Sequence, residues 1–521
     1  MEWKVEVDDF VRFAASTENH FKLFMKFADD STDTWIQKMM AIITVDANIT
    51  YQRYITDLGF RSKEEVKAES SRQTRSFLTR IEHVHGAEGK PIQGRDFVSG
   101  LDYGELQEKL VEIFLCCLDQ DLNYIVGRLH EIAQFETLLK CLLRNTPSVS
   151  WLKWQFDLTG SAVEDSQVPD ISYQDGVSYM NVTPEYDIML SVSQMSLGLN
   201  DQENCITKAN YPGFVNLYVP PGSNYSENLL PYLTLRESKY YLSALKFKKE
   251  IYQMLVELKA IADFNMEKPE VEKTSAEMEM KDFDINVIPH GPAIQIDERY
   301  LDEDIEPFLS YDVVPAIKFN GWPKCSQKWV SRERLWPPQS LVKEIIQEGF
   351  HLVPKTSPQG DEELEWRISF SKAEVKLMRA KGLGQRNYCY RMFKMAVKEN
   401  ISSACKLLST YHLKTLLLWA SERHPPDRWS DENIALCFVG LLDDLLHSLV
   451  NCSCPHYFIP ELNLFANCST DHLYYLASQV SAIRKSPLKY LQRPGENPTE
   501  SYNNFIAAMK EWNEEMRDNT E

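Results

Sequence analysis

The chain has 521 residues, of which 43% are hydrophobic and 25% charged, and its formal net charge is -20. This length can bury a sizeable core in two or more lobes, whereas the acidic balance argues against a general nucleic-acid coat, because binding phosphates requires Lys and Arg. The longest apolar stretch, Ile434 to Val450, is interrupted by Asp443 and Asp444, so we expect no membrane-spanning segment.

The first part of the chain predicts helices. Residues 1–95 are polar and helix-like, and we expect them to form an N-terminal extension. From Glu105 the apolar residues keep a spacing of 3.6, and this pattern continues towards Leu143. The spacing predicts one long helix, referred to below as the spine helix.

Short β-like runs follow and predict a mixed sheet. They span residues 186–192, 213–219, 285–288, 293–296 and 311–319. A helix is expected between the second and third runs, with Phe247 and Leu258 on its apolar face. Residues 265–283 are charged and predict a mobile loop. After Pro337 the pattern is mostly helical to about Ala482.

These elements predict an α+β protein with four parts along the chain. The parts are a helical N-terminal extension at 1–95, a core with the sheet and spine helix at 96–335, a C-terminal helical lobe at 336–490 and an acidic tail at 491–521.

Three acidic residues are the strongest chemical signal. Glu185 and Asp187 are two positions apart, so on a strand both project to the same face, and Asp312 begins another apolar run that could lie beside them. Carboxylates held together repel each other unless a cation such as Mg²⁺ lies between them. Two ions about 4 Å apart would stabilise the attacking and leaving oxygens of a phosphoryl transfer. The alternative is a chance acid-x-acid triplet, common in a chain with 76 acidic residues.

A glycine and a serine upstream strengthen this interpretation. Gly160 and Ser161 could bring backbone N–H groups and a hydroxyl close to phosphate oxygens at a helix start. Taken alone, the pair is more typical of an ordinary turn before a helix. Only the combination of the turn with the three acids predicts a phosphoryl-transfer site.

A basic segment and a group of cysteines complete the candidate features. Residues 372–398 contain eight Lys or Arg against one acid, which is typical of a solvated helix face and less often of a polyanion-binding surface. The eleven cysteines are typical of a reduced protein, so we expect the cytoplasm. A cluster of Cys452, Cys454, His456 and Cys468 fits no common zinc spacing, and we favour reduced cysteines at a helix end over a structural zinc site.

Several segments resemble the Mab-21 family, which includes cyclic GMP-AMP synthase and the animal cGAS-like receptors. The likeness runs from about Gly160 to Pro487. The most specific pieces are Tyr311 to Pro315 with Gly321-Trp322-Pro323, Trp366 to Glu374, Tyr411 to Thr415, and Pro455 to Pro460.

The resemblance implies a bilobed nucleotidyltransferase fold with a mixed twisted sheet, a long spine helix and a C-terminal helical lobe. It implies two Mg²⁺ (or Mn²⁺) ions on Glu185, Asp187 and Asp312. The implied substrates are ATP, GTP or other NTPs, joined into a cyclic dinucleotide in innate immune signalling. The residues that match the nucleotide-binding positions of the family are Gly160, Ser161, Arg367, Glu374, Lys394 and Tyr411.

The resemblance gives each of these residues an expected role. Ser161 and Lys394 would contact the donor triphosphate, Arg367 and Glu374 the acceptor base and the metal region, and Tyr411 would stack on a base. Double-stranded RNA or another polyanion is a candidate activator. The stretch before Cys389 lacks a zinc-binding His and Cys cluster, so DNA sensing through a zinc thumb is not expected. A silent scaffold, a nucleotide-binding protein and a linear oligonucleotide synthase stay open as alternatives.

Overall fold

The computed structural model describes residues 102–118, most of 132–199, 204–208, 211–221, 227–266, 283–300, 309–401 and 408–491, with Arg53 alone before them. The chain forms two compact units, one made of residues 1–87 and 119–156 and the other of residues 88–118 and 157–521. Nearly all of the predicted N-terminal extension, acidic tail and 265–283 loop lies outside the described residues.

The first unit contains a buried ion pair on a helical segment. Glu136 is fully buried, and its carboxylate contacts Arg53 at 2.6 Å and Lys140 at 2.7 Å. Two cations offset the cost of removing this carboxylate from water. Ile132 and Leu139 are also buried, so the apolar pattern predicted towards Leu143 does face a core in this unit.

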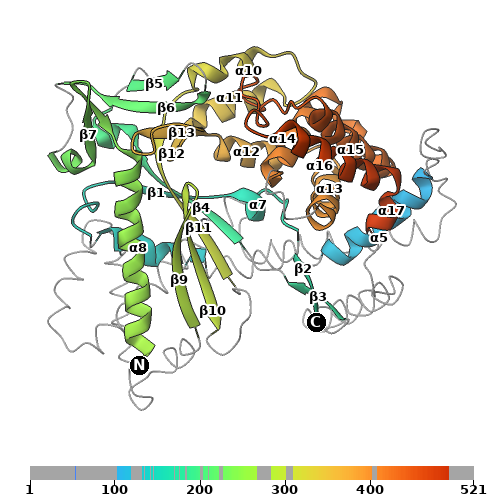
Figure 1. Ribbon diagram of the computed structural model, residues 1–521, viewed down its shortest axis with the longest axis horizontal. Helices are drawn as coiled ribbons and strands as arrows, with labels where there is room; N and C mark the ends of the chain where they lie inside the picture. The colour runs from blue at the N-terminus through green and yellow to red at the C-terminus, as the bar shows by residue number, and fades with distance from the viewer. Residues whose placement is uncertain are drawn as a thin grey trace, which may run out of the picture. The chain divides into compact units, whose positions relative to one another are not determined.

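The second unit contains a mixed sheet (Figure 1). Its main path runs β1 (Trp154–Thr159), β4 (Glu185–Ser193), β11 (Leu309–Phe319), β12 (Phe350–Pro354), β13 (Glu365–Ser369), β6 (Tyr211–Val219), β8 (Lys239–Leu242) and β7 (Leu233–Arg236). Off this path, β10 (Ala293–Tyr300) pairs with β11 and with β9 (Phe283–His290), and β5 (Cys205–Lys208) pairs with β6. A separate hairpin joins β2 (Asp170–Gln174) to β3 (Val177–Asn181). Strands β4 and β11 are parallel, whereas β12 joins β11 antiparallel, so the prediction of a mixed sheet is confirmed.

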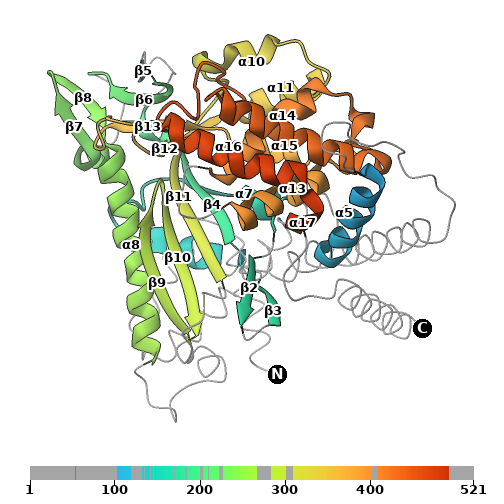
Figure 2. The same ribbon diagram turned by 45° about the vertical axis from the view of Figure 1, so that its right-hand side comes forward.

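One long helix covers part of the sheet. Helix α8 (Ala244–Met266) contacts β9, β11 and β12, and it lies along β9 in both Figure 1 and Figure 2. Its side chains Phe247, Ile251 and Met254 are buried, at the three- and four-residue spacing that the sequence predicts. The helix therefore packs against β11, the strand that carries Asp312.

The C-terminal helices form a lobe around one central helix. Helix α15 (Ile434–Val450) contacts α13 (Arg386–Asn400), α14 (Thr410–Arg423), α16 (Thr470–Lys485) and α5 (Tyr103–Leu118), while α17 (Pro487–Leu491) packs on α5 and α13 (Figure 2). By length and composition alone, the segment Asp431–Val450 could cross a membrane, and it is the one such helix in the described part of the chain. In this structure its apolar side chains, among them Phe438 and Leu442, lie in the core of the helical lobe.

Two strands occupy a region that the sequence predicts as helical. Strands β12 and β13 lie after residue 337, and both join the sheet, so the prediction of mostly helical structure is wrong for these segments. All five residues of β12 are buried, as are four of the five in β13. A strand buried on both faces, such as β12, need not alternate polar and apolar residues, so its sequence pattern does not distinguish it from a buried helix. Residues Glu365–Ser369 of β13 do alternate, and this signal for a strand was missed.

Candidate functional site

The parallel pairing of β4 and β11 brings the acidic residues together. Asp312 is the register partner of Asp187, and Glu185 lies at the start of β4 on the same face as Asp187. Burial raises the pKa of Asp187 to about 8, with further contributions from Glu185 and Asp312. The pKa of Asp312 rises to about 6, first through burial and then through Glu185. Glu185 therefore destabilises the charged forms of both Asp187 and Asp312.

A divalent cation fits the chemistry of this acidic group. Carboxylate oxygens are the ligands that Mg²⁺ prefers, and the buried Oδ1 atom of Asp312 has no hydrogen-bond partner. As the side chains stand, the described residues contain no group of three or more His, Cys, Asp or Glu arranged to hold a metal ion. Neither the acidic group nor the cluster of cysteines with His456 is therefore arranged as a metal site in this structure.

The predicted Gly160-Ser161 turn lies directly against Asp187. Gly160 begins the short helix α7 (Gly160–Val163) after β1, with a φ of +75° that L side chains rarely adopt. A Cβ atom at this position would lie 1.7 Å from Oδ2 of Asp187. Thr159 also donates a hydrogen bond from its hydroxyl to the backbone oxygen of Asp187, at 3.4 Å. The absence of a side chain at Gly160 therefore lets the turn and the carboxylate approach each other.

One cavity of about 730 Å³ collects eight of the nine residues that the sequence analysis selects. These eight are Gly160, Ser161, Glu185, Asp187, Arg367, Glu374, Lys394 and Tyr411. The ninth, Asp312, lines a second cavity of about 330 Å³ that shares Asp187 and Arg367 with the first. The two cavities adjoin at the acidic residues. Their residues come from both the sheet and the helical lobe.

Basic side chains also line the larger cavity. The Arg367 guanidinium is on β13, and burial lowers its pKa, while Tyr411 and Glu374 act in the opposite direction. Lys394, on α13, donates a hydrogen bond to the backbone oxygen of Ser166 at 3.2 Å. The pKa of Lys394 is lowered to about 8, mainly by burial and to a smaller extent by Lys398. The cavity thus combines a carboxylate wall with cationic groups suited to a triphosphate.

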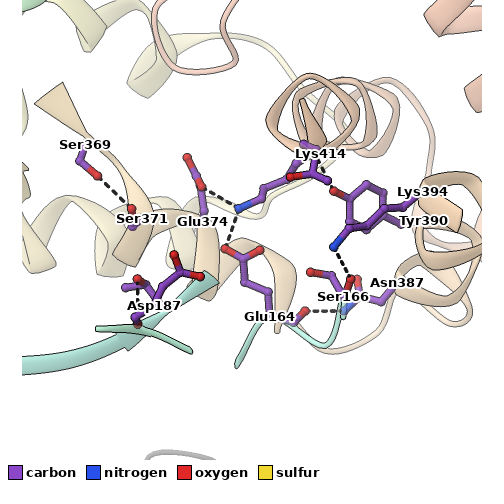
Figure 3. Close-up of polar contacts among 12 residues, drawn as sticks. Glu164, Ser166, Asp187, Ser369, Ser371, Glu374, Asn387, Tyr390, Lys394 and Lys414 are labelled. Carbon is purple, nitrogen blue, oxygen red and sulfur yellow. Dashed lines mark hydrogen bonds and ion pairs between the residues drawn. The ribbon is translucent and has the colours of Figure 1, made fainter. Parts of the chain in front are cut away.

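Lys414 is a site residue that the sequence analysis did not select. On α14, its ammonium contacts Oε1 of Glu164 at 2.8 Å and Oε2 of Glu374 at 3.0 Å (Figure 3). Glu374 is on α12 (Ser371–Met378), and Glu164 follows the Ser161 turn. A signal was present, because Lys414 lies three residues after Tyr411 and therefore on the same helix face.

Tyr411 has a hydrogen-bond partner that the sequence did not predict. Its hydroxyl lies 2.8 Å from Nε2 of His456, which comes from the loop between α15 and α16. The Nδ1 atom of His456 accepts hydrogen bonds from the backbone N–H groups of Phe458 and Ile459, each at 3.1 Å. Burial lowers the pKa of His456 to about 4, so the ring is neutral. Both His456 and Tyr411 line the larger cavity.

Much of the predicted basic segment is directed into the protein. Lys372 pairs with Asp157 at 2.7 Å and Lys376 with Glu348 at 3.7 Å. Arg386 and Arg391 are buried, with 1% and 4% of their surfaces exposed. These side chains therefore do not form one continuous solvent-facing basic strip.

Comparisons with known proteins agree with this architecture. The Mab-21 protein nucleotidyltransferase domain matches residues 179–380, and the Mab-21 protein HhH/H2TH-like domain matches residues 385–482. The first match begins after the Gly160-Ser161 turn and includes the three acids and the strands β12 and β13. The second match covers most of the helical lobe.

Two curated relatives extend the comparison. "Protein mab-21-like" of Drosophila melanogaster is 27% identical over 318 residues, which are 58% of this chain and 76% of the relative. "Protein mab-21-like" of Aedes aegypti is 27% identical over 326 residues, covering 58% of this chain and 79% of the relative. The chain belongs to the Mab-21 family and contains its nucleotidyltransferase and C-terminal helical domains.

Proposed function

We propose that this protein is a Mg²⁺- or Mn²⁺-dependent nucleotidyltransferase that joins two NTPs, such as ATP and GTP, into a cyclic dinucleotide. The observation that carries the proposal is that eight predicted site residues, separated by up to 251 positions in the sequence, line one cavity, while Asp312 pairs with Asp187 beside it. A cavity of this size is within the range of about 300–1,000 Å³ typical of small-molecule sites.

The acidic group would hold the metal. Glu185, Asp187 and Asp312 offer carboxylate oxygens whose repulsion a divalent cation would relieve. When bound, such ions stabilise the charge that develops on the attacking and leaving oxygens. The carboxylate of Asp312, which lines the smaller cavity, would accept the proton of the attacking hydroxyl group.

The remaining residues would bind and orient the substrates. The Ser161 hydroxyl and the Lys394 ammonium line the cavity where they could contact a triphosphate, and the Tyr411 ring offers a face for a base. In each transfer, the hydroxyl oxygen of one nucleotide bonds to the α-phosphorus of the other, and the bond to pyrophosphate breaks. A second transfer within the linear product closes the ring.

We also propose that turnover depends on a bound ligand and serves innate immune signalling in the cytoplasm. Double-stranded RNA or another polyanion is the first ligand to test. The inward pairs made by Lys372 and Lys376 argue against that segment as its main docking surface.

The alternative is a catalytically silent scaffold or nucleotide-binding protein. The observation that favours it is the contact between Lys414 and Glu374, because this glutamate already has a cationic partner. The fold and the cavity suit both functions, so only an activity assay separates them.

The test uses the full chain with labelled ATP, GTP, CTP and UTP and either Mg²⁺ or Mn²⁺, with and without double-stranded RNA. We expect a phosphatase-resistant product from the wild type and none from Asp312→Asn. Glu344→Gln, a change of an exposed carboxylate on α11 (Gln339–Glu348), is the matched control and should keep full activity. Equal product from the wild type and Asp312→Asn would refute catalysis at this site, and binding without any product would favour the silent alternative.

A further inference from the structure

We propose that His456 is a positioning residue for Tyr411, holding its ring on the cavity wall so that the face for a nucleobase is set before the nucleotide binds. This inference deepens the proposed function and rests on it, because it assigns a role to His456 only if a base stacks on Tyr411. It follows from the hydrogen bonds on both nitrogens of one buried imidazole.

The backbone determines which nitrogen of His456 carries the proton. Nδ1 lies 3.1 Å from the backbone nitrogen atoms of both Phe458 and Ile459, and each of these groups can only donate. An Nδ1 atom that accepts two hydrogen bonds has no proton of its own. In the neutral ring the proton is therefore on Nε2.

This tautomer determines the direction of the hydrogen bond to Tyr411. Nε2–H lies within hydrogen-bond reach of the Tyr411 hydroxyl, with 2.8 Å between the nitrogen and oxygen atoms, so the imidazole donates and the tyrosine oxygen accepts. The hydroxyl proton of Tyr411 is then available to Glu374, with which it also interacts. Glu374 in turn accepts a hydrogen bond from Lys414 at 3.0 Å. The Tyr411 oxygen is thus fixed from two sides.

The loop that carries His456 is itself held firmly. The backbone N–H of His456 donates to the backbone oxygen of Leu462 at 2.9 Å, and the ring of Phe458 stacks on Phe370 at a centroid distance of 4.4 Å. Phe370 directly follows β13. The orientation of Tyr411 therefore depends on a loop that is anchored to the end of the sheet.

A planar stacking face is useful only in a defined orientation. A tyrosine ring whose hydroxyl has lost one of these two partners is held less firmly on the cavity wall, and a nucleotide would have to select the oriented state. Fixing the orientation of the Tyr411 ring before the nucleotide binds lowers the free-energy cost of selecting that orientation. Removing one neutral hydrogen bond of this kind weakens binding by about 3- to 10-fold.

Two substitutions separate the two hydrogen-bonding roles of His456. In His456→Asn the side-chain oxygen of the amide can replace Nδ1 as an acceptor, but the shorter side chain cannot reach Tyr411, so the loop should stay folded while the ring is released. In His456→Gln the longer amide can donate to Tyr411 but does not reproduce the acceptor for the loop. We expect His456→Asn to weaken ATP and GTP binding and His456→Gln to lower the thermal unfolding temperature more.

The experiment is calorimetric titration of the full chain with ATP and with GTP, each in MgCl₂, alongside thermal unfolding. We expect His456→Asn and Tyr411→Phe each to raise the Kd for one or both nucleotides by about 3- to 10-fold. The double variant should be no weaker than the weaker single variant, because both changes remove the same hydrogen bond.

The outcomes distinguish this inference from the proposed function. A wild type that binds neither nucleotide overturns the proposed function, and the stacking role with it. A wild type that binds while His456→Asn stays within twofold of it overturns the positioning role alone. A double variant whose Kd rises by the product of the two single-variant increases also overturns the positioning role of His456.

Discussion

Replacing Gly160 with Ala tests how closely the turn at Gly160 and Ser161 packs against Asp187. The added Cβ atom would lie 1.7 Å from Oδ2 and 2.5 Å from Cγ of Asp187, distances at which either the carboxylate or the turn must move. The φ of +75° adds a strain of about 1–2 kcal/mol for a residue with a side chain. Misplacing a catalytic group by about 1 Å can cost about 100-fold in rate.

A second glycine separates strain from displacement. Gly382 has a φ of +85°, and a Cβ atom there would have no heavy atom within 4 Å. We therefore expect Gly382→Ala to lower the unfolding temperature by a few degrees through strain alone and to keep its activity. Gly160→Ala should lose about 100-fold in dinucleotide synthesis.

The assay compares initial rates and thermal unfolding of the two variants with the wild type. If Gly160→Ala is as active as Gly382→Ala, Asp187 does not need its present position against the turn, and the assignment of Gly160 to the site fails. If both variants are equally inactive, the loss comes from strain and not from Asp187.

Two further predictions concern the lysines of the cavity. Lys414→Met leaves the buried Glu164 and Glu374 without their shared cation, so the free energy of unfolding in urea should fall by about 3–5 kcal/mol at pH 7. This loss of stability should be smaller at lower pH, because burial already raises the pKa of Glu164 and protonation removes its charge. Lys343→Met changes an exposed lysine and is the control; an equal loss of stability in that variant would contradict the role of the Lys414 ion pairs. Because burial lowers the pKa of Lys394 to about 8, its charge is complete below that pH and lost above it, so wild-type ATP affinity should fall between pH 7 and 9. Lys394→Gln should bind more weakly at pH 7 with no such fall, and the same pH dependence in both proteins would exclude Lys394 as its source.

A short-range pattern was sufficient to predict that Glu185 and Asp187 lie on the same face of a strand. Glu185 and Asp187 share a face because strand side chains alternate, which requires only that β4 be extended. Asp312 depended on a guess that two apolar runs would pair, and the register of β4 and β11 places it opposite Asp187. The alternation of side chains along one strand depends only on neighbouring residues, so it can be predicted from the sequence. Which strand pairs with it depends on residues far away in the chain.

The parts that sequence could not supply are contacts between distant residues. Lys414 and Glu164 are 250 positions apart, and Tyr411 and His456 are 45 apart. A lysine on a helix is ordinarily a solvated charge, and His456 belonged to a cysteine-rich stretch that invited comparison with a zinc site. Which partner each residue finds depends on how the helical lobe packs, and no periodicity in the sequence encodes that packing.

Lys414 links the helical lobe to the turn at Gly160 and Ser161. Its ammonium joins α14 to Glu164, and the backbone N–H of Glu164 donates to the backbone oxygen of Gly160 at 3.1 Å. The same ammonium contacts Glu374, which interacts with Tyr411. A displacement of α14 would therefore disturb both the turn beside Asp187 and the Tyr411 ring. The two changes would come together, because moving one partner of a buried ion pair leaves an uncompensated charge.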